Sequence, residues 1–191
     1  MSAMTSQQIM QDSHVTRMRA LKDENARLRE ELARACEERD SLRQHVALAL
    51  LAARDAERLL ADGTLLIVDG WNAILGSENV RDKSDTGWRE QLKNIVAKRL
   101  EKCPDDIAWI VFDGHEVNGS TEGRLRISYT GGAGAHRADR MVCDYLRMRK
   151  ILGLSHPVTV VTDDKDFAKE AAALGAAVKG TDTLNAQTQA N

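Results

Sequence analysis

Two kinds of hydrophobic pattern divide this chain near Gly63. Before Gly63, apolar residues recur every three or four positions in a stretch without glycine or proline, and this spacing predicts one long helix. After Gly63, short apolar runs alternate with amphipathic stretches, as in domains of alternating strands and helices. We expect a disordered N-terminus at residues 1–17, a coiled-coil helix at 18–62, an α/β domain at 63–184 and a disordered tail at 185–191.

The helical segment repeats its apolar positions every seven residues. The two core positions of the repeat hold Met18, Leu21, Asn25, Leu28, Leu32, Ala35, Arg39, Leu42, Val46 and Ala49. This pattern is typical of a coiled coil, in which one buried Asn favours two parallel strands in register. We expect a homodimer through residues 18–60; the alternative is a single helix that packs on its own domain. A second stripe is expected to pack on the following domain and consists of Leu48, Leu51, Ala52 and Leu59.

The second part of the chain carries the patterns of several strands and helices. Strands are expected at 65–68, 107–112, 125–130, 158–161 and 176–179, and helices at 87–103, 137–152 and 166–174. This order predicts a three-layer α/β domain with a central, mostly parallel sheet. The segment from Gly63 onward is long enough to hold a core of its own, so we expect it to fold without the preceding helix.

Acidic residues follow three of the predicted strands. They are Asp69, Asp113, Asp163 and Asp164, with Asp166 just beyond. The carboxyl ends of strands in an open α/β sheet border its ligand-binding crevice, and Asp139, near the start of a helix, can join the acids there. Crowded carboxylates repel one another, and a hard divalent cation relieves the repulsion. Ligation by oxygen alone, without a His or Cys cluster, indicates magnesium or manganese.

Composition narrows the functional classes. Lys and Arg number 27 against 29 Asp and Glu, so the overall charge does not indicate a DNA-coating protein or a polybasic membrane anchor. The three cysteines are too far apart in sequence for a zinc ribbon or a disulfide framework, which indicates reduced thiols in the cytoplasm. The longest apolar stretch is too short to span a membrane, and we expect no membrane contact.

Four motifs follow one another in an order and spacing typical of one enzyme family. They are Leu65-Leu-Ile-Val-Asp-Gly-Trp-Asn72, Ile110-Val-Phe-Asp-Gly114, Ala138-Asp139-Arg140 and Val160-Val-Thr-Asp-Asp-Lys-Asp-Phe167. Together they resemble the NYN domain of the YacP-like ribonucleases, within the PIN-like nuclease superfamily, over about residues 64–184. The resemblance implies a PIN-like fold and metal-dependent cleavage of RNA, most simply as an endoribonuclease.

The resemblance also implies roles for individual residues. Asp69, Asp139 and Asp164 match the family's acids and are assigned as catalytic ligands of Mg²⁺ or Mn²⁺. The residues assigned to support them are Asn72, Asp113, Asp163 and Asp166. The chain departs from the family pattern at Gly131–Arg137, a Gly-rich and basic segment that stands where the family tends to carry acidic or amide residues.

Water activated by one or two divalent ions would cut the phosphodiester and leave a 5′ phosphate and a 3′ hydroxyl. RNA is the implied substrate, with messenger RNA on the ribosome as one candidate. A basic patch beside the Asp139 helix is expected to offset the repulsion between RNA and the acids, and it comprises Arg124, Arg126, His136, Arg137, Arg140, Arg147, Arg149 and Lys150. The residues assigned to contact RNA are His136, Arg137, Arg140 and Lys165.

One function of another class stays open. The chain could be an RNA-binding or adaptor protein whose PIN-like site is weak or silent and whose coiled coil makes the functional contacts. Other classes fit poorly: a haloacid-dehalogenase-type phosphatase needs a second acid where Trp71 stands, and a zipper-type transcription factor needs more basic residues than Arg17 and Arg19 before the seam.

Overall fold

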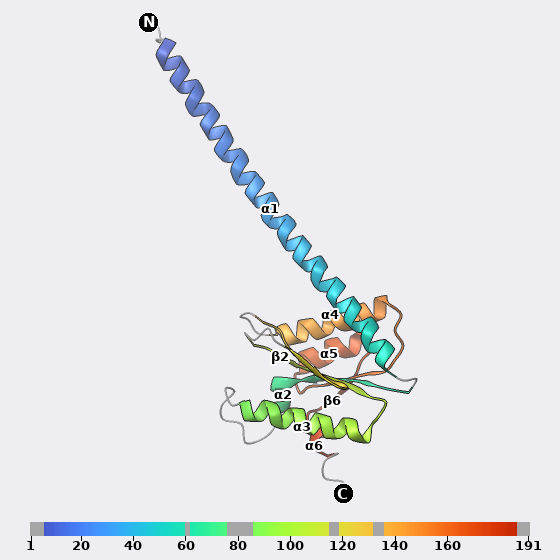
Figure 1. The fold of residues 1–191 in the computed structure, drawn as a ribbon. Coiled ribbons are helices and arrows are strands. Elements are labelled where there is room, and N and C mark those ends of the chain that lie inside the picture. The colour runs from blue at the N-terminus through green and yellow to red at the C-terminus, as the bar shows by residue number, and fades with distance from the viewer. Residues whose placement is uncertain (1–5, 60–61, 76–85, 115–118, 132–135, 187–191) are drawn as a thin grey trace. The chain divides into compact units, whose positions relative to one another are not determined.

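The computed structural model describes residues 6–59, 62–75, 86–114, 119–131 and 136–186. The chain forms two compact units, Met1–Val46 and Ala47–Asn191. The elements in chain order, labelled in Figure 1 where there is room, are α1 (Ser6–Arg58), β1 (Leu65–Asp69), α2 (Gly70–Leu75), α3 (Thr86–Lys102), β2 (Ile107–Phe112), β3 (Ser120–Glu122), β4 (Leu125–Tyr129), α4 (Arg137–Ile151), β5 (Val158–Val161), α5 (Lys165–Ala173), β6 (Ala177–Lys179) and α6 (Asp182–Ala186).

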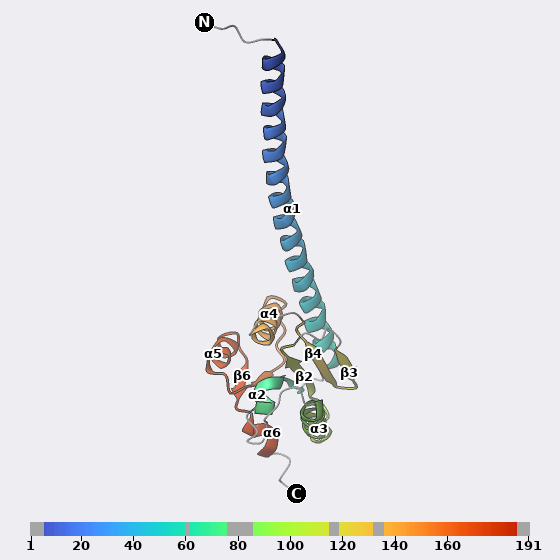
Figure 2. The same cartoon turned by 90° about the vertical axis from the view of Figure 1, so that its left-hand side faces the viewer.

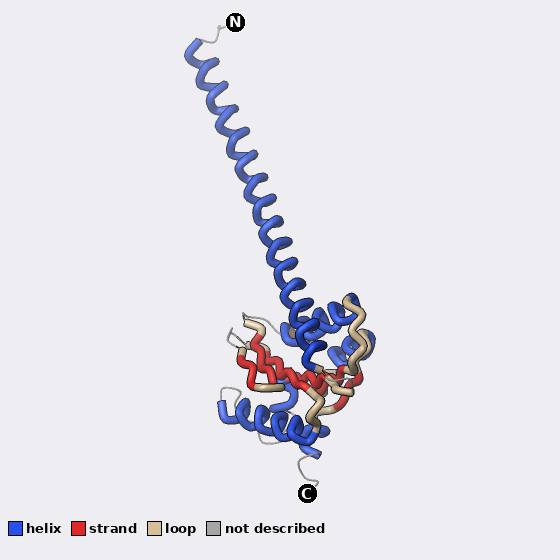
Figure 3. The backbone as a smooth tube through the Cα atoms, turned by 45° about the vertical axis from the view of Figure 1, so that its right-hand side comes forward, coloured by secondary structure: helices blue, strands red, loops and turns tan. Residues whose placement is uncertain are grey.

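The second unit is built on a six-stranded sheet with the order β3-β4-β2-β1-β5-β6. All neighbouring strands are parallel except β3 and β4, which are antiparallel. Helices α4 and α5 lie on one face of the sheet, and α2, α3 and α6 lie on the other (Figures 2 and 3). The expectation of a three-layer α/β domain with a mostly parallel sheet is therefore confirmed.

Alternating side chains of the central strands fill two separate cores. Leu65 and Ile67 of β1 enter the core beneath α4 and α5, whereas Leu66 and Val68 enter the core beneath α2 and α3. All five residues of β1 are buried, as are all six of β2. Strands covered by helices on both faces are apolar at consecutive positions, which makes them easy to recognise in a sequence.

The C-terminal segment of α1 belongs to this domain. Leu48, Ala52 and Leu59 are buried in the core beneath α4 and α5, and Leu51 packs against it. The packing expected of the second apolar stripe is thus confirmed. Asp55 is buried beside them, where its two oxygens lie 2.8 and 3.0 Å from Arg126 Nη1 and the Tyr145 hydroxyl donates at 2.6 Å. The second compact unit accordingly begins at Ala47, within α1.

The first unit consists of the remaining part of α1. The helix begins at Ser6, within the segment expected to be disordered, and its seam residues Leu21, Leu28 and Leu32 are exposed. The last residues of the expected tail, 187–191, lie outside the described part of the chain. Among the described residues, no helix combines the length and apolarity needed to cross a membrane.

Candidate functional site

The topology brings the predicted acids to one edge of the sheet. Strands β1, β2 and β5 are parallel neighbours, so Asp69 at the end of β1, Asp113 after β2 and Asp164 after β5 follow carboxyl ends on the same side. Asp139 joins them from the first turn of α4. The charges of Asp69, Asp113 and Asp164 each interact with Asp139 or with its neighbour His136. The convergence expected from strand order therefore occurs among these four acids.

Asp69 is the most deeply buried of the four, with 6% of its surface exposed. Its Oδ1 accepts from the backbone N–H of Asn72 at 3.2 Å, and its Oδ2 accepts from the Asn72 side-chain amide and from Thr162 Oγ1 at 3.1 Å. Burial raises the pKa of Asp69, the negative charge of Asp139 raises it further, and the bonds from Asn72 and Thr162 oppose the rise. Asn72, carried by the short helix α2 directly after β1, thus holds the Asp69 carboxylate in one orientation.

Three residues bring potential ligand atoms closest together. One ligand atom from each of His136, Asp139 and Asp164 lies within 4.8 Å of the others, and His136 Nδ1 is 2.9 Å from Asp139 Oδ2. Burial raises the pKa of Asp139, the hydrogen bond to His136 lowers it, and the charge of Asp164 raises it. The same hydrogen bond raises the pKa of His136, which favours its charged form. These shifts describe a site in which negative charge is crowded and a cation is favoured.

Asp164 and Asp113 also shape the site. Asp164 is the N-cap of α5, and its Oδ1 accepts from the backbone N–H groups of Asp166 at 2.9 Å and Phe167 at 3.0 Å. Oδ1 of Asp113 accepts from Thr130 Oγ1 at 3.1 Å and from the N–H of Ala138 at 2.7 Å. Asp113 therefore joins the ends of β2 and β4 to the start of α4, one residue before Asp139.

The other two acids assigned as supports are exposed and lie outside the group of three potential ligand residues. Asp163 is exposed, and its carboxylate accepts from the backbone N–H of Thr181 at 3.1 Å and from the Thr181 hydroxyl. It thereby fixes the turn before α6. Asp166 is exposed in the first turn of α5, and neither acid belongs to the ligand group found among the described residues. Successive residues after a strand point in different directions, so adjacency to Asp164 did not bring the Asp163 carboxylate to the same place.

The basic patch expected beside the Asp139 helix is largely dispersed. Arg124 donates to the carbonyls of Leu100, Cys103 and Asp106 at the end of α3, and Arg126 pairs with buried Asp55. Arg147 pairs with Asp144 and Glu170, and Arg149 is buried and donates to the His156 carbonyl at 2.8 Å. The prediction that these four arginines form one RNA-facing patch is wrong, because each guanidinium binds protein acceptors in a different part of the domain.

The residues assigned to contact RNA remain near the acids. Arg140 is exposed one position beyond Asp139, and its Nε donates to the His136 carbonyl at 3.3 Å. Arg137 is half-buried at the start of α4, and Lys165 is exposed at the start of α5. The glycine-rich residues 132–135, and His115 at the expected rim of the site, lie outside the described residues.

Aromatic residues near the site pack within the domain. Trp71 donates its indole N–H to the Asp113 carbonyl at 2.6 Å and meets the Phe112 ring edge to face. Trp109 is buried, and Trp88 packs against the core beneath α3. These three tryptophans therefore contribute to the packing of the domain.

His136 is the residue whose placement sequence reasoning missed. It was assigned to RNA contact, while metal ligation was expected from oxygen atoms alone; the structure places its ring nitrogen among the potential ligand atoms. Its backbone is left-handed, with φ 60° and ψ 25°, as the N-cap of α4. The available signal was a histidine three residues before the helix-borne Asp139, a spacing that lets the two side chains meet across the first turn.

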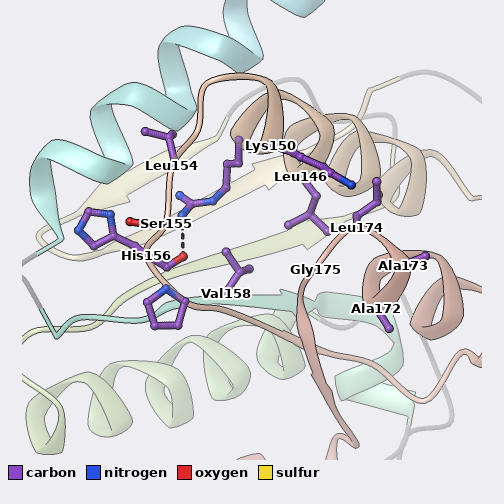
Figure 4. Close-up of a pocket in the computed structure, with 12 residues that line it drawn as sticks. Leu146, Lys150, Leu154, Ser155, His156, Val158, Ala172, Ala173, Leu174 and Gly175 are labelled. Atoms are coloured by element: carbon purple, nitrogen blue, oxygen red, sulfur yellow. Dashed lines mark hydrogen bonds between the residues drawn. The ribbon is translucent and has the colours of Figure 1, made fainter.

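A cavity of about 380 Å³ lies elsewhere in the domain (Figure 4). It is lined by residues from the ends of α4 and α5 and from the segment that leads into β5, including Leu146, His156 and Leu174. The acids follow the carboxyl end of β5, whereas this cavity borders Val158 at the amino end. The cavity therefore lies at the amino end of β5, and none of the site residues described above line it.

Comparison with known proteins matches this arrangement to one family. The model of the YacP-like NYN domain family matches residues 66–191. Among solved structures, a mutant form of Rae1 (YacP) from Bacillus subtilis is similar with a TM-score of 0.53 and 20% identity, over 66% of this chain and 75% of that chain. A second Rae1 structure has 21% identity and a TM-score of 0.48, over 65% of this chain and 77% of that chain.

A search of the curated proteins finds no match. The residues that match the family model make up most of the chain and include all four converging acids. The first of the two solved structures has the same fold. The chain therefore belongs to the YacP-like NYN domain family, which is ribonuclease-like.

Proposed function

We propose that this protein is a metal-dependent endoribonuclease that hydrolyses RNA phosphodiester bonds at the edge of the sheet where Asp69, Asp139 and Asp164 meet. The observations that carry the proposal are the proximity of Asp139 and Asp164, from α4 and the β5–α5 connection, and the electrostatic interaction of Asp69 at the end of β1 with Asp139, within a domain of a ribonuclease-like family. All three cysteines are free thiols, which agrees with action in the reducing cytoplasm.

The chemistry of the donor set fits a divalent cation. Carboxylate oxygens are the ligands that Mg²⁺ and Mn²⁺ prefer, and the potential ligand atoms of His136, Asp139 and Asp164 lie within 4.8 Å of one another. Burial raises the pKa of Asp69, and the negative charge of Asp139 adds to the rise; a nearby cation would favour the charged form of both acids. When bound, such an ion supplies positive charge that lowers the pKa of an attacking water and neutralises the phosphate.

The chain's own residues prepare the site for RNA. Asn72 and Thr162 hold the Asp69 carboxylate in place, and the capping bonds of Asp164 hold its carboxylate at the start of α5. The exposed side chains of Arg140 and Lys165 place positive charge beside the acids, where it would attract the RNA backbone. The N-terminus of α5 adds a further positive electrostatic contribution there.

The test is cleavage of total cellular RNA by the full-length protein and by its Asp69→Asn, Asp139→Asn and Asp164→Asn variants, with Mg²⁺, Mn²⁺ or EDTA. We expect cleavage by the unaltered protein with either ion, none with EDTA, and a loss of about 100-fold or more in each variant, because each removes a charge that holds the ion. Products should carry 5′ phosphates and 3′ hydroxyls.

Asp144→Asn is the matched control. Asp144 lies on the same helix as Asp139 but pairs with Arg147, so its removal should leave cleavage unchanged. Full activity in Asp69→Asn, or products with 2′,3′-cyclic phosphates, would overturn the proposed mechanism. RNA binding without cleavage under every metal condition would favour the RNA-binding or adaptor function instead.

We also propose that α1 joins two copies of the chain as a parallel homodimer through residues 18–46. Its seam exposes large apolar side chains, among them Leu28, Leu32 and Leu42, and such a stripe is normally covered by a partner. Two pairs of flanking charges, Glu24 with Arg29 and Glu38 with Arg43, would attract across an in-register parallel pair. The expected interface, residues 18–60, is shortened because Leu48, Ala52 and Leu59 are already buried in the domain.

A further inference from the structure

His136 occupies an unusual place among the site residues. It is the only non-glycine residue with positive φ in the described part of the chain, and its side chain is 71% exposed. Nδ1 of the ring is 2.9 Å from Asp139 Oδ2, and the carbonyl of the same residue accepts from the N–H of Arg140 at 3.2 Å. The main chain of His136 is thus tied to the first turn of α4 while its imidazole lies against the acids.

The spacing of these atoms matches the neighbouring positions of an octahedral ion. Ligand atoms about 2.1 Å from such an ion lie about 3.0 Å apart in adjacent positions and about 4.2 Å apart in opposite positions. The separation of 2.9 Å between His136 Nδ1 and Asp139 Oδ2 agrees with adjacent positions. The three ligand atoms, that of Asp164 included, all lie within 4.8 Å of one another, which is close to the separation of two opposite positions.

A nitrogen ligand changes which ion the site prefers. Mg²⁺ is a hard cation that binds oxygen and gives up its water reluctantly, so an imidazole adds little to its affinity. First-row transition ions accept imidazole and carboxylate together, and Mn²⁺ among them retains the octahedral, oxygen-rich coordination that the acids supply. A site of one imidazole and several carboxylates therefore favours Mn²⁺ over Mg²⁺, whereas carboxylates alone would bind the two ions in the same way.

We propose that His136 is a metal ligand and that it makes the site selective for Mn²⁺ over Mg²⁺. The inference rests on the proposed function, because it assigns a ligand and an ion to that same site.

The experiment measures metal binding by the full-length protein, separately from cleavage. Free Mn²⁺ is followed by electron paramagnetic resonance during titration, and Mg²⁺ affinity is obtained by competition. We expect the unaltered protein to bind Mn²⁺ at least about 10-fold more tightly than Mg²⁺, and His136→Ala to lose about 10-fold in Mn²⁺ affinity while its Mg²⁺ affinity changes less than about twofold. Modulation of the Mn²⁺ electron spin echo by a coordinated nitrogen should be present in the unaltered protein and disappear in the variant.

Two further variants separate ligation from other effects. His136→Gly removes the imidazole but adopts positive φ without strain, so it should lose Mn²⁺ selectivity as His136→Ala does. His45→Ala removes an exposed histidine from the first unit and should change nothing. Equal losses of both ions in His136→Ala, no loss of either, or selectivity that survives in His136→Gly would each overturn the proposal.

Asp139→Asn distinguishes the failure of this inference from the failure of the proposed function. If Asp139→Asn abolishes binding of both ions and cleavage while His136→Ala alters neither, the metal site stands and His136 is not its ligand. If Asp139→Asn leaves binding of both ions intact, the proposed metal site itself is wrong, and the role of His136 fails with it.

Discussion

Two segments of α1 have the same kind of apolar helical pattern, but they differ in how much of their apolar side chains is buried. In the first segment, residues 14–46, Leu32 is 64% exposed, whereas in the second segment, residues 47–58, Leu48 is 6% and Ala52 0% exposed. The second segment supplies part of the domain core, whereas the first leaves its large apolar side chains exposed. Periodicity thus shows that a helix will bury one face, but it does not show what will cover that face.

Removing the two segments separately should have the largest effect. A fragment of residues 47–191 is expected to fold and to cleave RNA, whereas a fragment of residues 63–191 is expected to be unfolded or aggregated. Losing Leu48 and Leu59 costs about 1.5–3 kcal/mol each, and leaving Arg126 without Asp55 adds about 3–5 kcal/mol. These losses approach the whole stability of a typical domain, about 5–15 kcal/mol.

Circular dichroism and thermal unfolding of the two fragments test this expectation. Cooperative unfolding of the 63–191 fragment at a temperature close to that of 47–191 would show that the second segment is dispensable, as the hydrophobic pattern alone had suggested. The intact chain, measured beside them, shows whether the first segment contributes to the stability of the domain.

A single substitution in the second segment should have the next largest effect. Asp55→Ala removes the partner of both Arg126 and the Tyr145 hydroxyl from a buried site, so we expect a loss of about 3–5 kcal/mol in the free energy of unfolding. Asp40→Ala in the first segment, whose exposed carboxylate pairs with Arg39, should change it by less than about 0.5 kcal/mol. Urea titration measures both, and similar losses in the two variants would contradict the comparison.

A substitution in the first segment should change association and leave the domain intact. Leu32→Asp places a charge in the middle of the proposed seam, so the full-length chain is expected to become a monomer with unchanged RNA cleavage. Light scattering at micromolar concentration reports the mass. A monomeric unaltered chain, or a Leu32→Asp variant that remains dimeric, would show that the stripe is not a self-association surface.

The smallest effect concerns two cysteines, one in each unit. Cys143 is buried, and burial raises its pKa to about 12, so its thiol stays protonated in the folded domain at pH 8. Cys36 is only half-buried in the first unit. Iodoacetamide at pH 8, followed by mass spectrometry, should label Cys36 and leave Cys143 unmodified until the protein is unfolded in guanidinium. Equally rapid labelling of Cys143 in the folded protein would show that the domain opens readily around α4.

The raised pKa of Cys143 also has a consequence for stability. The unfolded chain loses this proton near its ordinary pKa of 9.0, whereas the folded chain keeps it up to about pH 12. The folded state therefore binds more protons in this window, and its stability falls as the pH rises from about 9 to about 12. Cys143→Ser should reduce that fall, as measured by urea titration at pH 8 and pH 10.

Sequence reasoning located the main strands well because they are buried on both faces. The runs at 107–112 and 158–161 match β2 and β5, since largely apolar runs of this length are too short for a typical helix and are characteristic of buried strands. It missed α2, β3 and α6, which have three to six residues each. Such short elements hold too little of a repeat to be recognised and depend on contacts with the rest of the domain.

In the candidate site, too, some features could be predicted from the sequence and others could not. The order of residues along the chain was enough to predict the fold class, and to predict that acids following the strands lie at one edge of the sheet, because parallel strands align their carboxyl ends whatever loops join them. The folded domain was needed to show that Asp163 binds Thr181, that Asp164 faces Asp139, and that His136 joins the acids. The directions of side chains beyond a strand end depend on the turn that follows and on the donors that distant segments present. Those contacts form only when the chain folds and brings distant segments together, so the local sequence does not determine them.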